Sequence, residues 1–216
     1  MPADVNAPRP YHAPQRAERA ATTRRAVVSA AHELFTTQGY SATTVGQIAE
    51  RAGVAVDTLY AVVGRKPVLL REVVETAVSG EGGPVPAEQR GYVRAVRAAA
   101  TAGEKIDLYA AALARSGPRV APLFLALRDA AARDATCAAL HTEITERRAA
   151  NMRLFAADLR ATGELRPDLS DDEVADIVWS MNAADYYALL VHRRGWTPQR
   201  YGAFLADAWK RLLLSS

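Results

Sequence analysis

Apolar positions recur at intervals of three and four residues through most of the chain, which is the spacing of one face of an α-helix. No segment shows the sustained alternation of apolar and polar residues that marks a half-buried strand, and no repeat period is visible. Helix breaks are predicted near Gly103, at 116–118, near Asp134, at 163–168 and at 195–198. The pattern therefore predicts an all-α protein.

The most specific pattern lies between residues 43 and 66 and predicts two short helices joined at a glycine. Thr44 and Gln47 have the spacing of a capping box, in which a hydroxyl and an amide satisfy free backbone N–H groups at a helix start. An apolar stripe follows at Val45, Ile48, Ala49 and Ala52. Gly53 then stands where the backbone must enter the left-handed region. Two helices so joined form a helix-turn-helix, which places its second helix in the major groove of DNA.

The flanking segments extend this unit in both directions. Upstream, one helical face is formed by Val27, Ala30, Ala31, Leu34 and Phe35. Downstream, Pro67 suits the first turn of a further helix, because proline there sacrifices no intrahelical hydrogen bond. Three helices and the start of a fourth are therefore predicted within residues 20–79.

At this point the chain resembles the TetR family of bacterial repressors. The residues that carry the resemblance are Phe35, Gly39, Tyr40, Thr43, Thr44, Val45, Ile48, Ala49, Ala52, Gly53, Val54, Thr58, Leu59, Tyr60 and Lys66. The resemblance implies an N-terminal three-helix DNA-binding domain, a larger helical domain for ligand binding and dimerisation, and a homodimer on a palindromic operator. From it and from the charge pattern, the predicted DNA-binding residues are Arg24, Thr43, Thr44, Val56, Asp57, Thr58, Tyr60, Arg65 and Lys66.

The second helix of the motif departs from the family pattern. Ala55 stands where members carry serine or threonine, and an alanine N-cap costs about 1 kcal/mol against serine. Ala55, Val56 and Ala61 can contact thymine methyl groups but cannot hydrogen-bond to a base edge. Asp57 could accept a hydrogen bond from a cytosine amino group, or could simply complement the helix dipole. The first alternative predicts that Asp57→Asn relaxes preference at one operator position.

Charge is distributed as DNA binding requires. The chain has 216 residues and a formal net charge of +3, and residues 1–66 hold eight Arg and Lys against five Asp and Glu. Residues 67–216 hold nineteen of each, so the whole surplus lies in the predicted DNA-binding part. Neutralising phosphates with such residues gives binding that weakens steeply with salt.

Three segments are predicted: a disordered arm over residues 1–18, the helix-turn-helix domain over 19–66 and the helical domain over 67–216. The arm is rich in proline, and the segment 79–86 forms the clearest linker. No run approaches the roughly 18 apolar residues of a membrane span, and no signal-peptide core begins the chain. The single Cys137 excludes an intrachain disulfide, so a cytoplasmic protein is expected.

Two late segments are apolar over more than one helical face. The first runs from a cap at Ser170 to Val191, and the second runs from Tyr201 to Leu213. Helices of this kind are buried on several sides. Pairing across a two-fold axis in a homodimer would supply the extra cover, and packing within one chain is the alternative.

A small-molecule effector is expected in the helical domain, where aromatic walls and a few polar groups would form its site. The candidate lining residues are Tyr109, Leu113, Phe124, Met152, Phe155, Trp179, Asn182, Tyr186 and Tyr187. Asn182 and Tyr186 lie four residues apart on one predicted helix, so they are expected to orient a ligand together.

The sequence contains no motif that indicates an enzyme active site. The four histidines have no metal-ligand spacing, no glycine-rich loop follows a strand, and Cys137 has no evident activating partner. No cofactor or metal is therefore predicted, and the chain is expected not to be an enzyme. The alternatives left open are a helical enzyme or small-molecule-binding protein with a structural helix-turn-helix, and a DNA-binding protein that takes no ligand.

Overall fold

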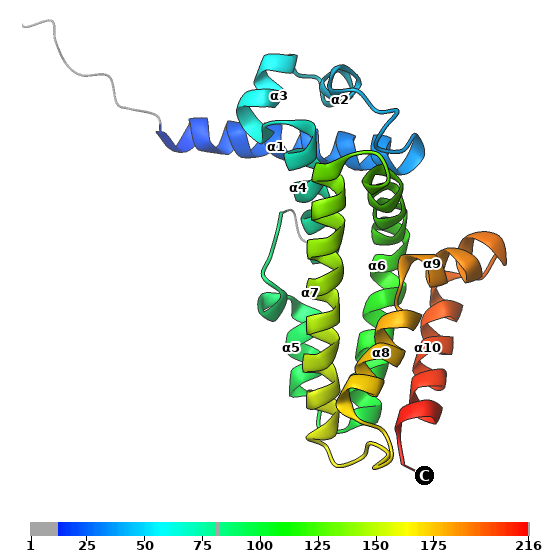
Figure 1. Ribbon diagram of the computed structural model, residues 1–216. Helices are drawn as coiled ribbons and strands as arrows, with labels where there is room; N and C mark the ends of the chain where they lie inside the picture. Colours follow the sequence, from blue (N-terminus) through cyan, green and yellow to red (C-terminus); the bar gives the residue numbers. More distant parts are fainter. Residues whose placement is uncertain (1–12, 81–82, 216) are drawn as a thin grey trace, which may run out of the picture.

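The N-terminal domain consists of three helices and the start of a fourth that leads out of it. In a computed structural model, which describes residues 13–80 and 83–215, these are α1 (Ala13–Thr37), α2 (Val45–Ala52), α3 (Val56–Val63) and α4 (Lys66–Ser79). Helices α2 and α3 lie on one side of α1, and α4 passes from α1 towards the rest of the molecule (Figure 1). The three-helix unit predicted from the sequence is thus confirmed.

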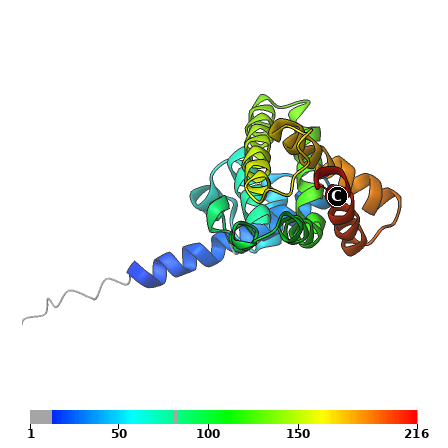
Figure 2. The same ribbon diagram turned by 90° about the horizontal axis from the view of Figure 1, so that it is seen from below.

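Helix α1 begins earlier than the sequence predicted. It starts at Ala13, so residues 13–18 are helical and do not belong to a disordered arm. The remaining part of that prediction lies outside the described residues. From below, the first turns of α1 extend away from the other helices (Figure 2). The side chains of residues 16–22 are accordingly exposed.

The second domain is built on two long antiparallel helices, α6 (Ala102–Ala131) and α7 (Ala135–Arg160), which stand beneath α1 (Figure 1). The other elements are η1 (Ala87–Gln89), α5 (Gly91–Ala98), α8 (Asp171–Met181), α9 (Ala184–Tyr187), the π-helical η2 (Ala188–Arg193) and α10 (Pro198–Leu213). Every regular element within residues 13–80 and 83–215 is helical, which confirms the all-α fold. No described helix is long and apolar enough to cross a membrane.

Two predicted helix boundaries are wrong. The break predicted at 116–118 does not occur, because α6 continues through Gly117, Pro118 and Pro122. The segment predicted as one helix from Ser170 to Val191 is divided after Met181. There Asn182 ends α8, and the chain turns before α9 begins. The starts predicted at Pro67, Asp134 and Ser170 are confirmed by the helices that begin there.

The buried apolar residues form two clusters that meet along α6. The upper cluster joins α1–α4 to the adjoining ends of α6 and α7, with Phe35, Leu59 and Leu70 fully buried. The lower cluster joins α5–α10 around Tyr201 and Trp209. The N-terminal domain therefore shares its core with the helices of the second domain.

Most of the apolar side chains of the last helix, α10, are buried within the chain itself. Tyr201, Leu205, Trp209 and Leu213 pack inside the lower cluster, where α10 lies against α6. Leu212 remains exposed. Packing within one chain, the alternative left open by the sequence, therefore buries most of these side chains.

Candidate nucleic-acid interface and effector cavity

The helix-turn-helix is set by its predicted local interactions. Thr44 caps α2: its hydroxyl accepts from the backbone N–H of Gln47 at 3.2 Å, and the Gln47 side chain accepts from the Thr44 N–H at 2.7 Å. Gly53 ends the helix with φ of 68°, a conformation that favours glycine. Ala55 begins α3 without a side-chain cap, as expected from the residue type.

Helix α3 has one buried face and one exposed face. Leu59 and Val63 are buried against the domain core. On the other side, Val56 is 40% exposed and Tyr60 46% exposed. Asp57, Thr58 and Ala61 share the exposed side. The helix is therefore anchored from behind and free to contact a partner in front.

Thr43 does not belong to this exposed surface, so its prediction as a DNA contact is wrong. Its side chain is only 1% exposed, and its hydroxyl donates to the carbonyl oxygens of Gly39 at 2.8 Å and Leu34 at 3.3 Å. These bonds fix the turn between α1 and α2. Thr43 thus positions Thr44, which is exposed at the start of α2.

Two predicted cationic contacts already have internal partners. The Arg24 guanidinium donates to the Glu72 carboxylate and to the carbonyl oxygen of Val62, which ties α1 to α3 and α4. The Lys66 ammonium lies 4.1 Å from the ring centroid of Tyr40, and burial lowers the pKa of Lys66. Arg65, in contrast, is exposed and has no ion-pair partner among the described residues.

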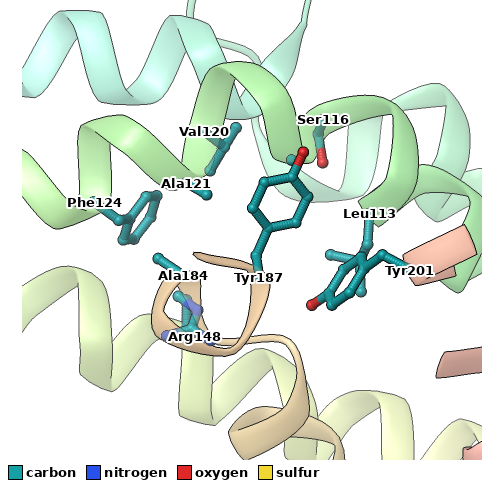
Figure 3. A pocket seen from close by; sticks show the side chains of 10 residues that line it. Leu113, Ser116, Val120, Ala121, Phe124, Arg148, Ala184, Tyr187 and Tyr201 are labelled. Carbon is teal, nitrogen blue, oxygen red and sulfur yellow. The ribbon is translucent and has the colours of Figure 1, made fainter. Parts of the chain in front are cut away.

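A cavity of about 70 Å³ lies at the seam between the two apolar clusters. Helices α6, α7, α9 and α10 surround it (Figure 3). It is lined by Leu113, Ser116, Gly117, Val120, Ala121, Phe124, Arg148, Ala184, Tyr187 and Tyr201. Val120 and Phe124 pack against the upper cluster, which contains the core of the N-terminal domain, so the cavity borders both domains.

Arg148 is the one charged side chain among the described residues that line this cavity. Its Nη2 donates to the Asn182 side-chain oxygen and to the carbonyl oxygen of Trp179. The guanidinium carbon also lies 5.5 Å from the ring centroid of Trp179. Burial lowers the pKa of Arg148, because leaving water disfavours its charged form. Neutral groups thus hold a partly desolvated cation at the cavity wall.

Tyr187 occupies the middle of the same cavity. Its ring reaches from α9 towards α6, between Phe124 on one side and Tyr201 on the other (Figure 3). The ring packs on the backbone of Gly117, where an added Cβ would lie 2.3 Å from Cε2 of Tyr187. Glycine at this position therefore allows the ring to enter, and the ring limits the free volume.

A wider crevice of about 500 Å³ lies where α1, α4 and α6 meet. Several of its polar side chains are engaged with protein groups: Arg24 binds Glu72, and Arg119 donates to the carbonyl oxygen of Ala77 at 2.7 Å. His32 lies 3.1 Å from the carbonyl oxygen of Arg119. These contacts connect α1 and α4 to α6, and the crevice is the junction between the domains.

Comparison with known families identifies the N-terminal unit. Residues 27–73 match the family described as bacterial regulatory proteins, tetR family. This match places the N-terminal unit, residues 27–73, in the tetR family. The matched family consists of bacterial regulatory proteins, in agreement with the regulator predicted from the sequence. Comparison with curated protein sequences found no match.

Solved structures with the same fold extend the TetR comparison over most of the chain. A putative transcriptional regulator from Saccharomonospora viridis in complex with choline is 16% identical, with a TM-score of 0.69 over 89% of this chain and 98% of that one. The regulator FadR from Bacillus subtilis, in complex with stearoyl-CoA, is 17% identical, with a TM-score of 0.69 over 85% and 96%. NalD from Pseudomonas aeruginosa is 18% identical, with a TM-score of 0.69 over 92% and 98%.

The structure brings only some of the predicted effector residues to the cavity. Leu113, Phe124 and Tyr187 line it. The others lie outside its lining: Tyr109, Met152, Phe155, Trp179, Asn182 and Tyr186. Most of these form the aromatic core of the lower cluster, in which Tyr109 stacks on Trp209 with ring centroids 5.8 Å apart. Aromatic character in the sequence therefore marked the core as well as the cavity.

The expectation that Asn182 and Tyr186 act together from one helix is wrong. Asn182 ends α8 and Tyr186 lies on α9, so they do not share a helical face. The Asn182 side chain donates to the Tyr109 hydroxyl at 2.8 Å and accepts from Arg148. Asn182 therefore holds Arg148 at the cavity wall without lining the cavity itself.

The sequence prediction missed Arg148, although a signal was present. Ile144, Arg148, Met152 and Phe155 follow one another at helical spacing, so an arginine interrupts an apolar stripe. A cation at such a position must be buried with a partner or face a cavity.

Proposed function

We propose that the chain is a repressor that binds a palindromic operator as a homodimer and releases it when a small molecule enters the cavity at the seam. The exposed face of α3 carries this proposal, because Val56 and Tyr60 leave the core on the side that a major groove would meet. Binding there would combine apolar contacts to bases with contacts to phosphates from Thr44 and Arg65. Access to the chromosome would place the protein in the cytoplasm.

A path from the cavity to α4 supports ligand control. Arg148 lines the cavity, and its neighbour Arg147 donates to Glu75 on α4 at 2.5 Å. A second pair, Arg71 on α4 with Glu143 on α7, lies one turn away at 2.5 Å. A shift of α7 caused by a ligand would therefore move α4, whose buried side chains belong to the DNA-binding core. Such a ligand must favour one arrangement over the other.

Similar structures bind small molecules, but they do not indicate which molecule this chain binds. Choline and stearoyl-CoA, which are bound in two of the similar structures, differ in charge and in size. Membership of the fold therefore fixes neither the size nor the chemistry of an effector, and both must come from the cavity of this chain.

Selection of bound sequences from random DNA duplexes tests the proposal, with the enriched sequence then titrated at two salt concentrations. We expect a palindrome with half-sites separated by about one helical turn, near 34 Å. Affinity should fall steeply with salt. Failure to enrich any sequence would show that the exposed face of α3 does not read DNA. An enriched site without two-fold symmetry would contradict the homodimer.

A further inference from the structure

The arginines of α7 differ in one respect that points to the chemistry of the effector. Arg147, Arg153 and Arg160 each form an ion pair, with Glu75, Asp172 and Asp171 respectively. The fourth, Arg148, is the one that lines the cavity, and it pairs with no carboxylate among the described residues. The arginine in the least solvated position is thus the one without a counter-ion.

The surroundings of Arg148 hold its guanidinium in place without neutralising it. The Asn182 oxygen accepts from Nη2, and the Asn182 amide is itself held by the Tyr109 hydroxyl. The hydrogen bonds of Arg148 within the described chain run from Nη2 alone, which leaves Nε and Nη1 without a protein acceptor. Arginine stays protonated in proteins, so this position keeps its charge. Unused N–H donors on a fixed cation form a site for an anion.

The remaining lining restricts what else the anion can carry. Leu113, Val120, Ala121, Phe124 and Ala184 make most of the wall apolar, and no acidic side chain contributes to it within the described residues. A carboxylate suits the guanidinium, since its two oxygens can accept two parallel N–H bonds. The apolar wall suits a short hydrocarbon or aromatic body attached to that carboxylate.

We propose that the effector of this regulator is a small carboxylic acid, whose carboxylate binds Arg148 and whose apolar part lies against Phe124 and Val120. This inference rests on the proposed function, because it assigns a ligand class to the same cavity. The cavity of about 70 Å³ is small beside the 300–1,000 Å³ of sites for drug-sized ligands. A body larger than a few atoms must therefore displace the Tyr187 ring from Gly117.

Matched probes that share a body and differ in charge test the proposal on the full chain. The probes are butyrate, butyramide and butylamine, and benzoate, benzamide and benzylamine, each titrated by calorimetry. We expect the acid in at least one set to bind about 10- to 100-fold more tightly than its amide, as charge-assisted hydrogen bonds imply. The amine should bind more weakly still. Equal binding of acid and amide, or no acid binding at millimolar concentration, would overturn the proposal.

The variant Arg148→Met removes the charge and retains much of the side-chain volume. It should lose the preference for the acid, whereas the control Arg153→Met, on the same helix and exposed, should keep it. Arg148→Lys keeps a cation but lacks the two parallel N–H donors of a guanidinium, so it should retain part of the preference for the acid. This second variant gives an answer if Arg148→Met fails to fold. An undiminished preference for the acid in either Arg148 variant would contradict the assignment.

Operator binding separates this inference from the proposed function. If an acid binds through Arg148 and operator affinity does not change, the result supports the proposed ligand class. It contradicts the proposal that the ligand releases the operator. If a neutral or cationic molecule releases the operator and acids do not bind, the result supports the proposed ligand-controlled regulator. It contradicts the proposal that the ligand is a carboxylic acid.

Discussion

The N-terminal domain and the bundle around the cavity differ in how completely their buried polar groups are satisfied. In the N-terminal domain, buried Thr43 donates to backbone carbonyl oxygens, and Leu59 and Leu70 are fully buried in the apolar core. In the bundle, the indole N–H groups of Trp179 and Trp209 are buried without a hydrogen-bond partner, and Arg148 has no counter-ion among the described residues. Unsatisfied polar groups are costly. Neither indole lines the cavity, so Arg148 is the group there that a bound anion could satisfy.

The backbone differs in the same way. Helix α2 begins at a capping box and ends at a left-handed glycine, as regular helices do. Beside the cavity, a four-residue α9 runs into the π-helical η2, and π-helical turns are often found at functional sites. A regular unit that presents α3 is therefore joined to a less regular one that can rearrange.

The largest effect is expected from Leu59→Ala. Leu59 is fully buried behind the exposed face of α3, so truncation should lower the free energy of unfolding by about 2–5 kcal/mol and abolish operator binding. Val56→Ala, on the exposed face of the same helix, should change stability by less than about 0.5 kcal/mol. Denaturant unfolding of both variants measures the difference. Similar values for the two would mean that α3 is not anchored as described.

A smaller loss is expected from Gly202→Ala, which tests the packing of α10 on α6. A Cβ at Gly202 would lie 2.8 Å from Cβ of Ala114 and 3.0 Å from the carbonyl oxygen of Ala110. Overpacking of this kind should cost about 1–3 kcal/mol. Gly103→Ala is the control, since its nearest neighbour is Cε of Lys210 at 4.0 Å. Thermal unfolding of the two variants in parallel would show whether α10 tolerates separation from α6.

The smallest effect concerns the exposed pair between α4 and α7. Arg71 lowers the pKa of Glu143 in the folded chain, so the pair stabilises the fold above the usual glutamate pKa, near 4.5. That contribution should vanish as the pH falls through the depressed pKa of Glu143. The stability difference between the wild-type chain and Arg71→Gln should therefore be constant near neutral pH and shrink below about 4.5. If the stability difference between the wild-type chain and Arg71→Gln persists at low pH, Arg71 stabilises the fold through an interaction other than its ion pair with Glu143.

The sequence predicted the N-terminal domain well because its signals are local. Thr44 with Gln47 and then Gly53 define α2 within ten residues, and the structure confirms each of them. The cavity depends instead on contacts between distant residues, such as Tyr187 on Gly117 and Asn182 on Arg148. Spacing along one helix does not reveal such contacts.

The wrong helix boundaries have the same origin. Gly117 and Pro118 normally indicate a break, yet α6 continues through them, because its flanking residues are buried in both apolar clusters and packing outweighs local preference. Conversely, Asn182 ends α8 where apolar spacing predicted continuation, and its side chain binds the distant Tyr109.

The central claim is that the cavity at the seam controls the DNA-binding face. The most direct test is the operator dissociation constant of the full chain, measured with and without a saturating amount of the acid that binds most tightly. We predict weaker operator binding with the acid, a reciprocal loss of acid affinity when operator is bound, and neither effect in Arg148→Met. An operator dissociation constant that the bound acid leaves unchanged would contradict the central claim.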